Sequence, residues 1–163
     1  MQIAIISDTH LKEHSAKLEL LGSHLTDADL VVHAGDYGDY QIMNYFRNRF
    51  NFIGVWGNVD DNSIRSSLNE KEIIQIGALR IGIVHGHGEK KNTPMRAFDA
   101  FDNTALDVII FGHSHQPSIS TKNKVLMLNP GSAFQKRKER WFSYISLIID
   151  HAELHASLIL FNN

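Results

Sequence analysis

Residues 2–10 read QIAIISDTH, an apolar run whose end is marked by Asp8 and His10. Four later stretches have the same form: LVVHAGD (30–36), FIGVWGN (52–58), IGIVHGH (81–87) and VIIFGHSH (108–115). Short apolar runs of this kind are typical of buried strands in parallel sheets. Ligands of such sheets bind beyond the carboxyl ends of the strands. We therefore expect these five polar endings to meet at one edge of the fold.

The sequence between these runs predicts the remaining elements. Apolar residues at helical spacing predict helices over 12–25, 39–49 and 93–103, with Pro94 in the first turn of the last one. The predicted strands cover 2–7, 29–33, 52–56, 71–77, 79–85, 107–111, 117–121, 124–128, 142–149 and 153–160. Gly77-Ala78 is typical of a hairpin turn. A parallel first part followed by a more antiparallel second part predicts an α/β fold, with two sheets face to face and helices outside.

Length and composition narrow the class of protein. With 163 residues, 43% hydrophobic and 21% charged, the chain is expected to form a single domain over residues 1–163. A net charge of −2 argues against long nucleic acid or a membrane surface as partner. The absence of cysteine excludes disulfides and thiolate zinc sites. No signal peptide and no apolar run of about 20 residues is found, which favours a cytoplasmic protein.

Seven polar residues stand at the ends of the five runs. They are Asp8, His10, Asp36, Asn58, His85, His113 and His115. Carboxylate, amide and imidazole groups together are typical ligands of first-row transition metals. Seven ligands exceed what one ion needs, so we predict two divalent ions, with the carboxylate of Asp36 between them.

The residues alone leave the division of these ligands open. Asp8, His10 and one of the two last histidines can complete the first ion, and Asn58, His85 and the other histidine the second. Such a pair of ions activates water near neutral pH and binds phosphoryl oxygens, which favours an anionic substrate such as a phosphate ester.

Five motifs in this order resemble the calcineurin-like metallophosphoesterase superfamily. They are DxH (Asp8, His10), GD (Gly35-Asp36), GNxD (Gly57 to Asp60), HGH (His85 to His87) and GHSH (Gly112 to His115). The chain is most similar to the small single-domain phosphodiesterases of that superfamily, which the turn Asn129-Pro130-Gly131-Ser132 also resembles.

The resemblance implies a four-layer α/β/β/α sandwich of two mixed sheets and a dinuclear centre. Manganese is the metal it favours, with nickel, zinc, iron and magnesium as alternatives. By resemblance, Asp8, His10, Asp36 and His115 bind one ion, and Asp36, Asn58, His85 and His113 bind the other. It further implies hydrolysis of a small phosphate ester by a hydroxide held between the ions, with Asp36 and Asn58 as catalytic residues.

One position departs from the superfamily pattern. Many larger members have a histidine directly after the asparagine of GN, and this chain has Val59, which cannot donate a proton. His87 and Asp60 are the candidate proton donors, or the leaving group departs unassisted. Activated esters with good leaving groups are expected to suffer least from this difference.

Several alternatives remain open at this level. The same fold serves as a protein-binding scaffold in a eukaryotic retromer subunit, and phosphomonoesterases use the same metals. His33 is interpreted either as a buried, hydrogen-bonded histidine or as a support for a metal ligand. The basic segment Lys136 to Arg140 either contacts substrate phosphate or forms a solvated loop. Homo-oligomer formation is also left open.

Overall fold

The computed structural model describes residues 1–151 and 153–162. Its elements follow the predicted order and are, along the chain, β1 (Gln2–Ile6), α1 (Ala16–His24), β2 (Leu30–His33), α2 (Tyr40–Arg49), β3 (Phe52–Gly54), α3 (Asn62–Arg65), β4 (Lys71–Ile76), β5 (Leu79–Val84), α4 (Thr93–Asp99), β6 (Val108–Ile110), β7 (Ser118–Lys122), β8 (Val125–Asn129), β9 (Phe142–Asp150) and β10 (Glu153–Phe161). Among the described helices, none has the length and apolar character needed to cross a membrane.

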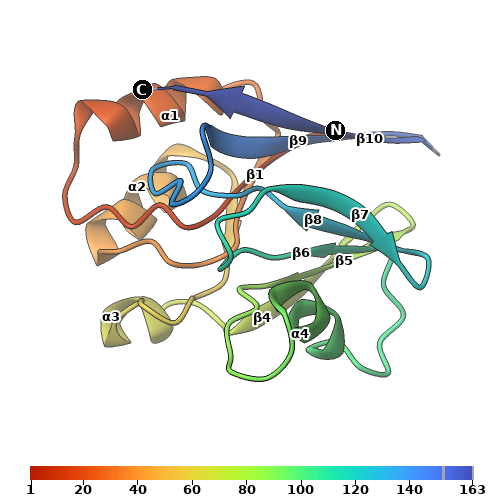
Figure 1. Ribbon diagram of the computed structural model, residues 1–163. Helices are drawn as coiled ribbons and strands as arrows, with labels where there is room; N and C mark the ends of the chain where they lie inside the picture. The colour runs from red at the N-terminus through yellow and green to blue at the C-terminus, as the bar shows by residue number, and fades with distance from the viewer. Residues whose placement is uncertain (152, 163) are drawn as a thin grey trace.

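The strands form two mixed sheets of five strands each (Figure 1). The first sheet has the order β10-β9-β1-β2-β3, and the second has the order β4-β5-β6-β8-β7. In the first, β1, β2 and β3 are parallel, and β9 and β10 are antiparallel to their neighbours. In the second, β5, β6 and β8 are parallel, and β4 and β7 lie antiparallel at its edges.

Three apolar clusters define four layers. One lies between the sheets and includes Ile5 of β1 and Ile83 of β5. A second joins α1 and α2 to the outer face of the first sheet, and a third joins α4 to the outer face of the second. Figure 1 shows α1 and α2 on one side of the molecule and α4 on the other. The α/β sandwich of two mixed sheets flanked by helices, expected from the resemblance, is confirmed.

The division of the strands between the sheets differs from the sequence-based expectation of a parallel half and an antiparallel half. The last hairpin, β9–β10, returns to the first sheet, where Leu147 of β9 pairs with Ile3 of β1. This pairing covers the free edge of β1 and buries both side chains completely. Contacts between residues so far apart leave no local pattern, so only the folded chain shows them.

Capping side chains set the helix boundaries. Ser15 accepts a hydrogen bond from the Leu18 N–H, so α1 starts later than the predicted residue 12. Asp39 and Asp61 cap α2 and α3 in the same way. The helix predicted over 93–103 ends at Asp99, and Asn103 has left-handed backbone with φ of 63°. Pro94 lies in the first turn, as predicted.

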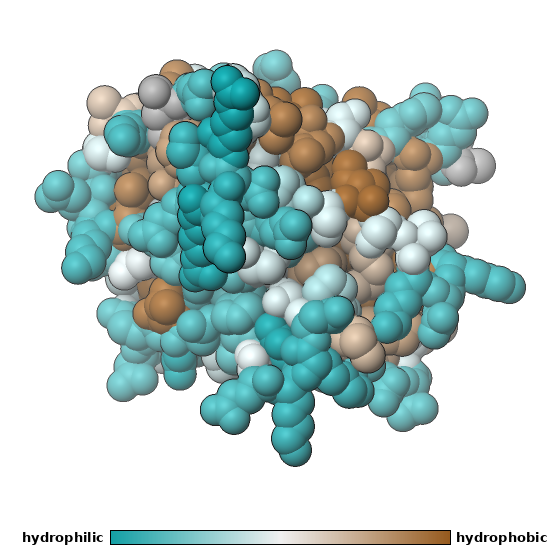
Figure 2. Space-filling view, viewed as in Figure 1, coloured by the Kyte–Doolittle hydropathy of each residue, from teal (hydrophilic) through white to brown (hydrophobic). Residues whose placement is uncertain are grey.

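Hydrophobic side chains also gather on part of the surface (Figure 2). The exposed apolar residues include Ile119 of β7, Ile148 of β9 and Leu160 of β10. Of the aromatic residues in and after α2, Phe46 is completely buried and Tyr40 is exposed.

Candidate metal centre

The polar strand endings of the two sheets adjoin one another. The His113 N–H, beyond β6 of the second sheet, donates to Oδ2 of Asp8, beyond β1 of the first, at 2.9 Å. His85, which follows β5, reaches the Ala34 carbonyl beyond β2, with Nδ1 at 2.7 Å from the oxygen. Because β1, β2, β3, β5 and β6 run in the same sense within their sheets, their carboxyl ends form one shared edge. The expected meeting of these endings is therefore observed.

Asp8, His10 and His115 form the first group of side chains that could hold a metal ion, with one donor atom from each within 4.8 Å of the others. Nε2 of His115 lies 3.2 Å from Oδ1 of Asp8, and Nε2 of His10 lies 3.7 Å from the same oxygen. The two Nε2 atoms are 3.2 Å apart. Three donor atoms from two loops thus converge on one point.

Asp36, His85 and His113 form the second group. Nε2 of His85 lies 3.1 Å from Oδ2 of Asp36. Asn58 adds an amide oxygen, 2.9 Å from Nδ1 of His113. Oδ2 of Asp36 also lies 3.7 Å from Nε2 of His10, so the same oxygen faces both groups.

Two ring orientations are fixed by carbonyl groups behind the histidines. Nδ1 of His85 contacts the Ala34 carbonyl, and Nδ1 of His115 makes a short contact with the Gln135 carbonyl. A carbonyl oxygen can only accept a hydrogen bond, so each Nδ1 carries the proton and each Nε2 presents its lone pair. This tautomer is the one that binds a metal through Nε2.

The electrostatics of the two groups suit a divalent cation. Burial alone would raise the pKa of Asp8, but the adjacent imidazoles of His10 and His115 hold that pKa well below its usual range. Burial would likewise raise the pKa of Asp36, and the neighbouring His85 lowers it. Burial, assisted by His85, lowers the pKa of His113 to about 4. Burial alone would lower the pKa of His85, but Asp36 and Asp8 raise it. Metal is bound by ionised carboxylates and neutral imidazole, so a cation at the second group competes with a proton on His85.

Three buried side-chain atoms make no hydrogen bond to any residue that the structure describes. They are Nδ1 of His87, Oδ1 of Asp8 and Nε2 of His85. An unpaired buried polar atom is costly unless another partner satisfies it. The atoms of Asp8 and His85 belong to the two groups that could hold a metal ion, and the donor set therefore fits the divalent metals expected from the sequence.

Left-handed backbone distinguishes five of the seven predicted ligands. Their φ angles are 54° at Asp8, 48° at His10, 62° at Asp36, 67° at His113 and 59° at His115. This region is uncommon for residues other than glycine, and such strain concentrates at functional sites. No sequence pattern predicts this conformation, because neither Asp nor His requires it.

The Asp60 side chain forms hydrogen bonds to the backbone of two loops, the one that carries Asp36 and the one that carries Asn58. Its carboxylate accepts hydrogen bonds from the backbone N–H groups of Asp36 (2.9 Å), Tyr37 (2.8 Å) and Gly57 (2.7 Å). The side chain is 3% exposed. Both oxygens are therefore engaged with backbone, and this geometry favours a positioning role for Asp60 over proton donation to a substrate.

Val59 contacts the site through its backbone N–H and not through its side chain. Its N–H donates to Oδ1 of Asp36 at 3.0 Å, and its side chain is 50% exposed. The other candidate proton donor, His87, lies beside the second group, with its ring centre 5.7 Å from that of His85. Burial and the adjacent His85 lower the pKa of His87, so its ring is neutral near pH 7.

The Asn129-Pro130-Gly131-Ser132 turn forms hydrogen bonds to the loops that carry the predicted ligands. Nδ2 of Asn129 donates to the Gly112 carbonyl and to Oγ of Ser114, both at 3.0 Å. Oγ of Ser132 donates to the Asp8 carbonyl at 2.6 Å and accepts from the Gln135 N–H at 2.8 Å. The sequence shows this turn as a motif, but it does not show that the turn positions the loops of Asp8 and His115.

His33 is a buried histidine with both ring nitrogens engaged. Nδ1 accepts from the Gly35 N–H at 3.1 Å, so Nε2 carries the proton and donates to Oγ1 of Thr9 at 3.2 Å. Burial lowers the pKa of His33 to about 3, and the ring is neutral. His33 thus joins the loop of Asp8 to the loop of Asp36 and agrees with the interpretation as a buried, hydrogen-bonded histidine. Neither of its partners, Thr9 and Gly35, is a predicted metal ligand.

Replacing Ser132 by Ala is expected to weaken metal binding by about 10- to 100-fold, the usual effect of removing a group that orients a ligand. The Asp8 carbonyl and the Gln135 N–H both lose their partner, which frees the loops that carry Asp8 and His115. Isothermal titration with Mn²⁺ measures the change. Ser157→Ala, at an exposed position of β10, serves as control, and equal affinities of the two variants would contradict the assigned role.

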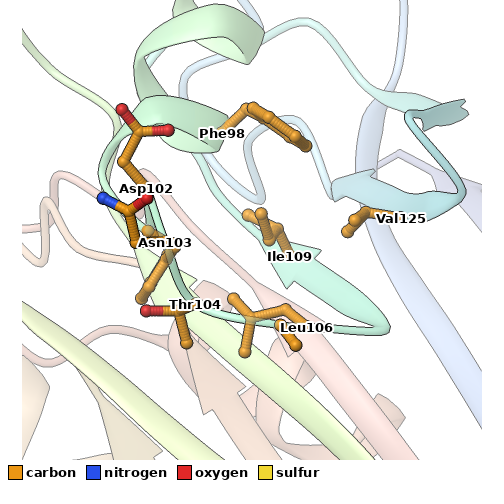
Figure 3. Close-up of a pocket in the computed structure, with 9 residues that line it drawn as sticks. Phe98, Asp102, Asn103, Thr104, Leu106, Ile109 and Val125 are labelled. Atoms are coloured by element: carbon orange, nitrogen blue, oxygen red, sulfur yellow. The ribbon is translucent and has the colours of Figure 1, made fainter.

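Two cavities differ in their relation to the ligand groups. One, of about 310 Å³, lies between α4 and the second sheet and is lined by apolar side chains such as Phe98, Leu106 and Ile109 (Figure 3). It contains none of the predicted site residues. The other, of about 330 Å³, includes His115 of the first group in its lining.

Comparison with known proteins agrees with this geometry. The family model described as the calcineurin-like phosphoesterase superfamily domain matches residues 1–152. A probable metallophosphoesterase of Methanocaldococcus jannaschii is 32% identical over 138 residues, covering 81% of this chain and 68% of the relative. A phosphodiesterase of the same organism is 29% identical over 145 residues, covering 80% of this chain and 83% of the relative.

Solved structures share the fold. An archaeal protein described as a novel phosphodiesterase superimposes with a TM-score of 0.77 at 23% identity, covering 99% of this chain and 100% of that one. Vps29 of Entamoeba histolytica, solved with Zn²⁺, gives a TM-score of 0.70 at 22% identity, covering 99% of this chain and 100% of that one.

Proposed function

Because this chain belongs to the calcineurin-like phosphoesterase superfamily, we propose that it is a metal-dependent phosphodiesterase that hydrolyses a small phosphate ester. The observation that carries the proposal is the pair of ligand groups that share one oxygen of Asp36, at 3.1 Å from His85 and 3.7 Å from His10. The relative named a phosphodiesterase supports the same activity.

In this proposal Asp8, His10, Asp36 and His115 hold one divalent ion, and Asp36, Asn58, His85 and His113 hold the other. Two such ions would supply an ionised water near neutral pH and positive charge for the phosphoryl oxygens. The chain itself positions the ligands through the carbonyls of Ala34 and Gln135 and through the carboxylate of Asp60. Asn58 is exposed, so its amide is also accessible to the substrate.

Manganese is the metal that we propose, with nickel, zinc, iron and magnesium as alternatives. Mixed oxygen and nitrogen ligands accept all of these ions, and availability commonly decides among them. The Vps29 structure with Zn²⁺ shows that a protein of this fold takes up zinc.

We propose that the leaving group departs without a strong general acid. The side chain of Val59 cannot donate a proton, the oxygens of Asp60 accept backbone N–H groups, and His87 is neutral near pH 7. His87 remains the nearest ring that can donate a hydrogen bond. Diesters with good leaving groups are consequently the expected best substrates, in preference to monoesters.

A protein-binding scaffold is the second candidate, because the fold is shared with Vps29 and fold alone does not determine function. The complete set of seven ligand side chains favours the enzyme. As part of the same proposal, the protein acts in the cytoplasm on a small molecule, not on long nucleic acid or membranes. Homo-oligomer formation stays a prediction.

We expect the metal-free protein to be inactive and Mn²⁺ to restore hydrolysis of bis(p-nitrophenyl) phosphate. Calorimetry should give two ions per chain, and saturation at about 100 times Kd should stabilise the fold by about 2.7 kcal/mol for each ion in urea unfolding. The rate on p-nitrophenyl phosphate, measured in parallel, tests the diester preference. A protein that binds no divalent ion and hydrolyses neither ester would support the scaffold instead.

A further inference from the structure

A cleft of about 330 Å³ opens directly beside the first ligand group. One wall is the segment Ser114 to Gln116, which includes the ligand His115. The other wall is the segment Lys136 to Glu139, in the loop between β8 and β9. A molecule bound at the proposed metal centre therefore has an adjacent space into which one of its substituents can extend.

The second wall is strongly basic. It carries Lys136, Arg137 and Lys138 in succession, with Glu139 as the one acidic residue of the cleft. The chain as a whole has a net charge of −2, so this concentration of positive charge is local. Hydrophilic side chains also cover the part of the surface where the β8–β9 loop lies in Figure 1 (Figure 2).

These cations differ in how they are held. Nζ of Lys136 donates to the Arg140 carbonyl at 3.0 Å and lies 4.9 Å from the centre of the Phe142 ring, which fixes its position. Arg137 and Lys138 are exposed. Neither forms an ion pair with any carboxylate within residues 1–151 and 153–162. Two positive groups therefore remain available to a ligand.

The basic wall is connected rigidly to the metal centre. The Gln135 carbonyl, one residue before Lys136, contacts Nδ1 of His115. The Gln135 N–H donates to Oγ of Ser132, and that hydroxyl donates to the Asp8 carbonyl. The start of the basic segment is thus tied by hydrogen bonds to the loops of both ligands, which keeps Arg137 and Lys138 close to the site.

We propose that this cleft is a second anion subsite and that the preferred substrate is a phosphodiester with a further phosphate group on one of its alcohols. A simple diester has a single negative charge, which the proposed metal centre already neutralises, so it gains little from the additional cations. A second phosphate would meet Arg137 and Lys138, and charged hydrogen bonds of guanidinium and ammonium to phosphate are among the strongest in proteins. The inference rests on the proposed function.

The test uses two diesters that differ only in the second phosphate. They are the p-nitrophenyl ester of thymidine 5′-monophosphate and the same compound with a 3′-phosphate. With the Mn²⁺-loaded protein, we expect a KM about ten-fold lower for the phosphorylated compound, corresponding to about two charged hydrogen bonds partly screened by solvent. The variant R137A/K138A should lose this preference and keep its activity on the unphosphorylated diester.

Two further variants separate charge from structure. Arg80 and Lys17 are exposed and lie outside the cleft, so R80A/K17A removes the same charges and should keep the preference. R137K/K138R retains the charges and should restore most of it. Equal KM values for the two diesters in the wild-type protein, or a preference that survives in R137A/K138A, would overturn the subsite.

A binding measurement distinguishes failure of the subsite from failure of the proposed activity. Calorimetry compares thymidine 3′,5′-bisphosphate with thymidine 5′-monophosphate on the Mn²⁺-loaded protein, and it needs no turnover. A bisphosphate preference of about ten-fold that R137A/K138A removes would support the subsite even in a protein that hydrolyses neither diester. Equal affinities would reject the subsite whatever the activity.

Discussion

Replacing Asp36 by Asn is expected to lower kcat/KM for an aryl phosphodiester by about 10³-fold, the scale on which loss of a main electrostatic contact reduces an enzyme's rate. Oδ2 of Asp36 faces both ligand groups, at 3.1 Å from His85 and 3.7 Å from His10. An amide oxygen retains the geometry but not the charge that offsets repulsion between two cations. The number of Mn²⁺ ions per chain should accordingly fall below two.

The fold of this variant should survive, because the amide oxygen can still accept the Val59 N–H that Oδ1 of Asp36 accepts at 3.0 Å. Asp150→Asn is the matched control, since its side chain is 72% exposed and lies at the distant end of β9. Turnover and metal content are measured for both proteins. If D36N retained more than a tenth of the activity with two bound ions, Asp36 would not be the bridge.

Replacing Asp60 by Ala is expected to reduce the free energy of unfolding by about 3–5 kcal/mol, because each buried N–H left without a partner costs about 1–3 kcal/mol. The carboxylate accepts three such groups at 2.7–2.9 Å, from Asp36, Tyr37 and Gly57. No other side chain within reach replaces them among the described contacts of these three groups. Urea unfolding of the metal-free protein measures the loss.

The neighbouring Asp61 provides the control. It is exposed and caps the short helix α3 through Ser63 and Ile64, so Asp61→Ala should cost about 1 kcal/mol, the usual effect of losing a cap. The metal-loaded D60A protein should also bind Mn²⁺ more weakly, since the loop of Asp36 is released. Similar unfolding free energies for the two variants would contradict the support role of Asp60.

The residue types of the candidate site can be predicted from the order of residues along the chain. Polar residues after apolar runs identified Asp8, Asp36 and His85, because parallel strands carry their polar ends to one edge of a sheet. The sequence also shows that Val59 replaces the histidine found in many larger members of the superfamily. Only the structure shows that its backbone N–H donates to Asp36 while its side chain is exposed.

The positions of the remaining parts depended on contacts between distant residues. Ser132 and Asp8 are separated by 124 residues and meet through one hydrogen bond. The sequence leaves Asp60 open as a proton donor, and the backbone N–H groups bound to its carboxylate favour a positioning role instead. The basic residues Arg137 and Lys138 could be a solvated loop in sequence, and the structure places them in a cleft that includes His115.

The sequence by itself determined the fold class and the chemical character of the site. Buried strands and helices leave periodic apolar patterns that local residue order carries, and ligand types follow from side-chain chemistry. The tertiary structure decided which candidate ligands lie together, with His115 beside Asp8 and His113 beside Asp36. It also decided that β9 and β10 complete the first sheet. These features arise from long-range packing and from left-handed backbone at the ligands, and neither leaves a pattern in neighbouring residues.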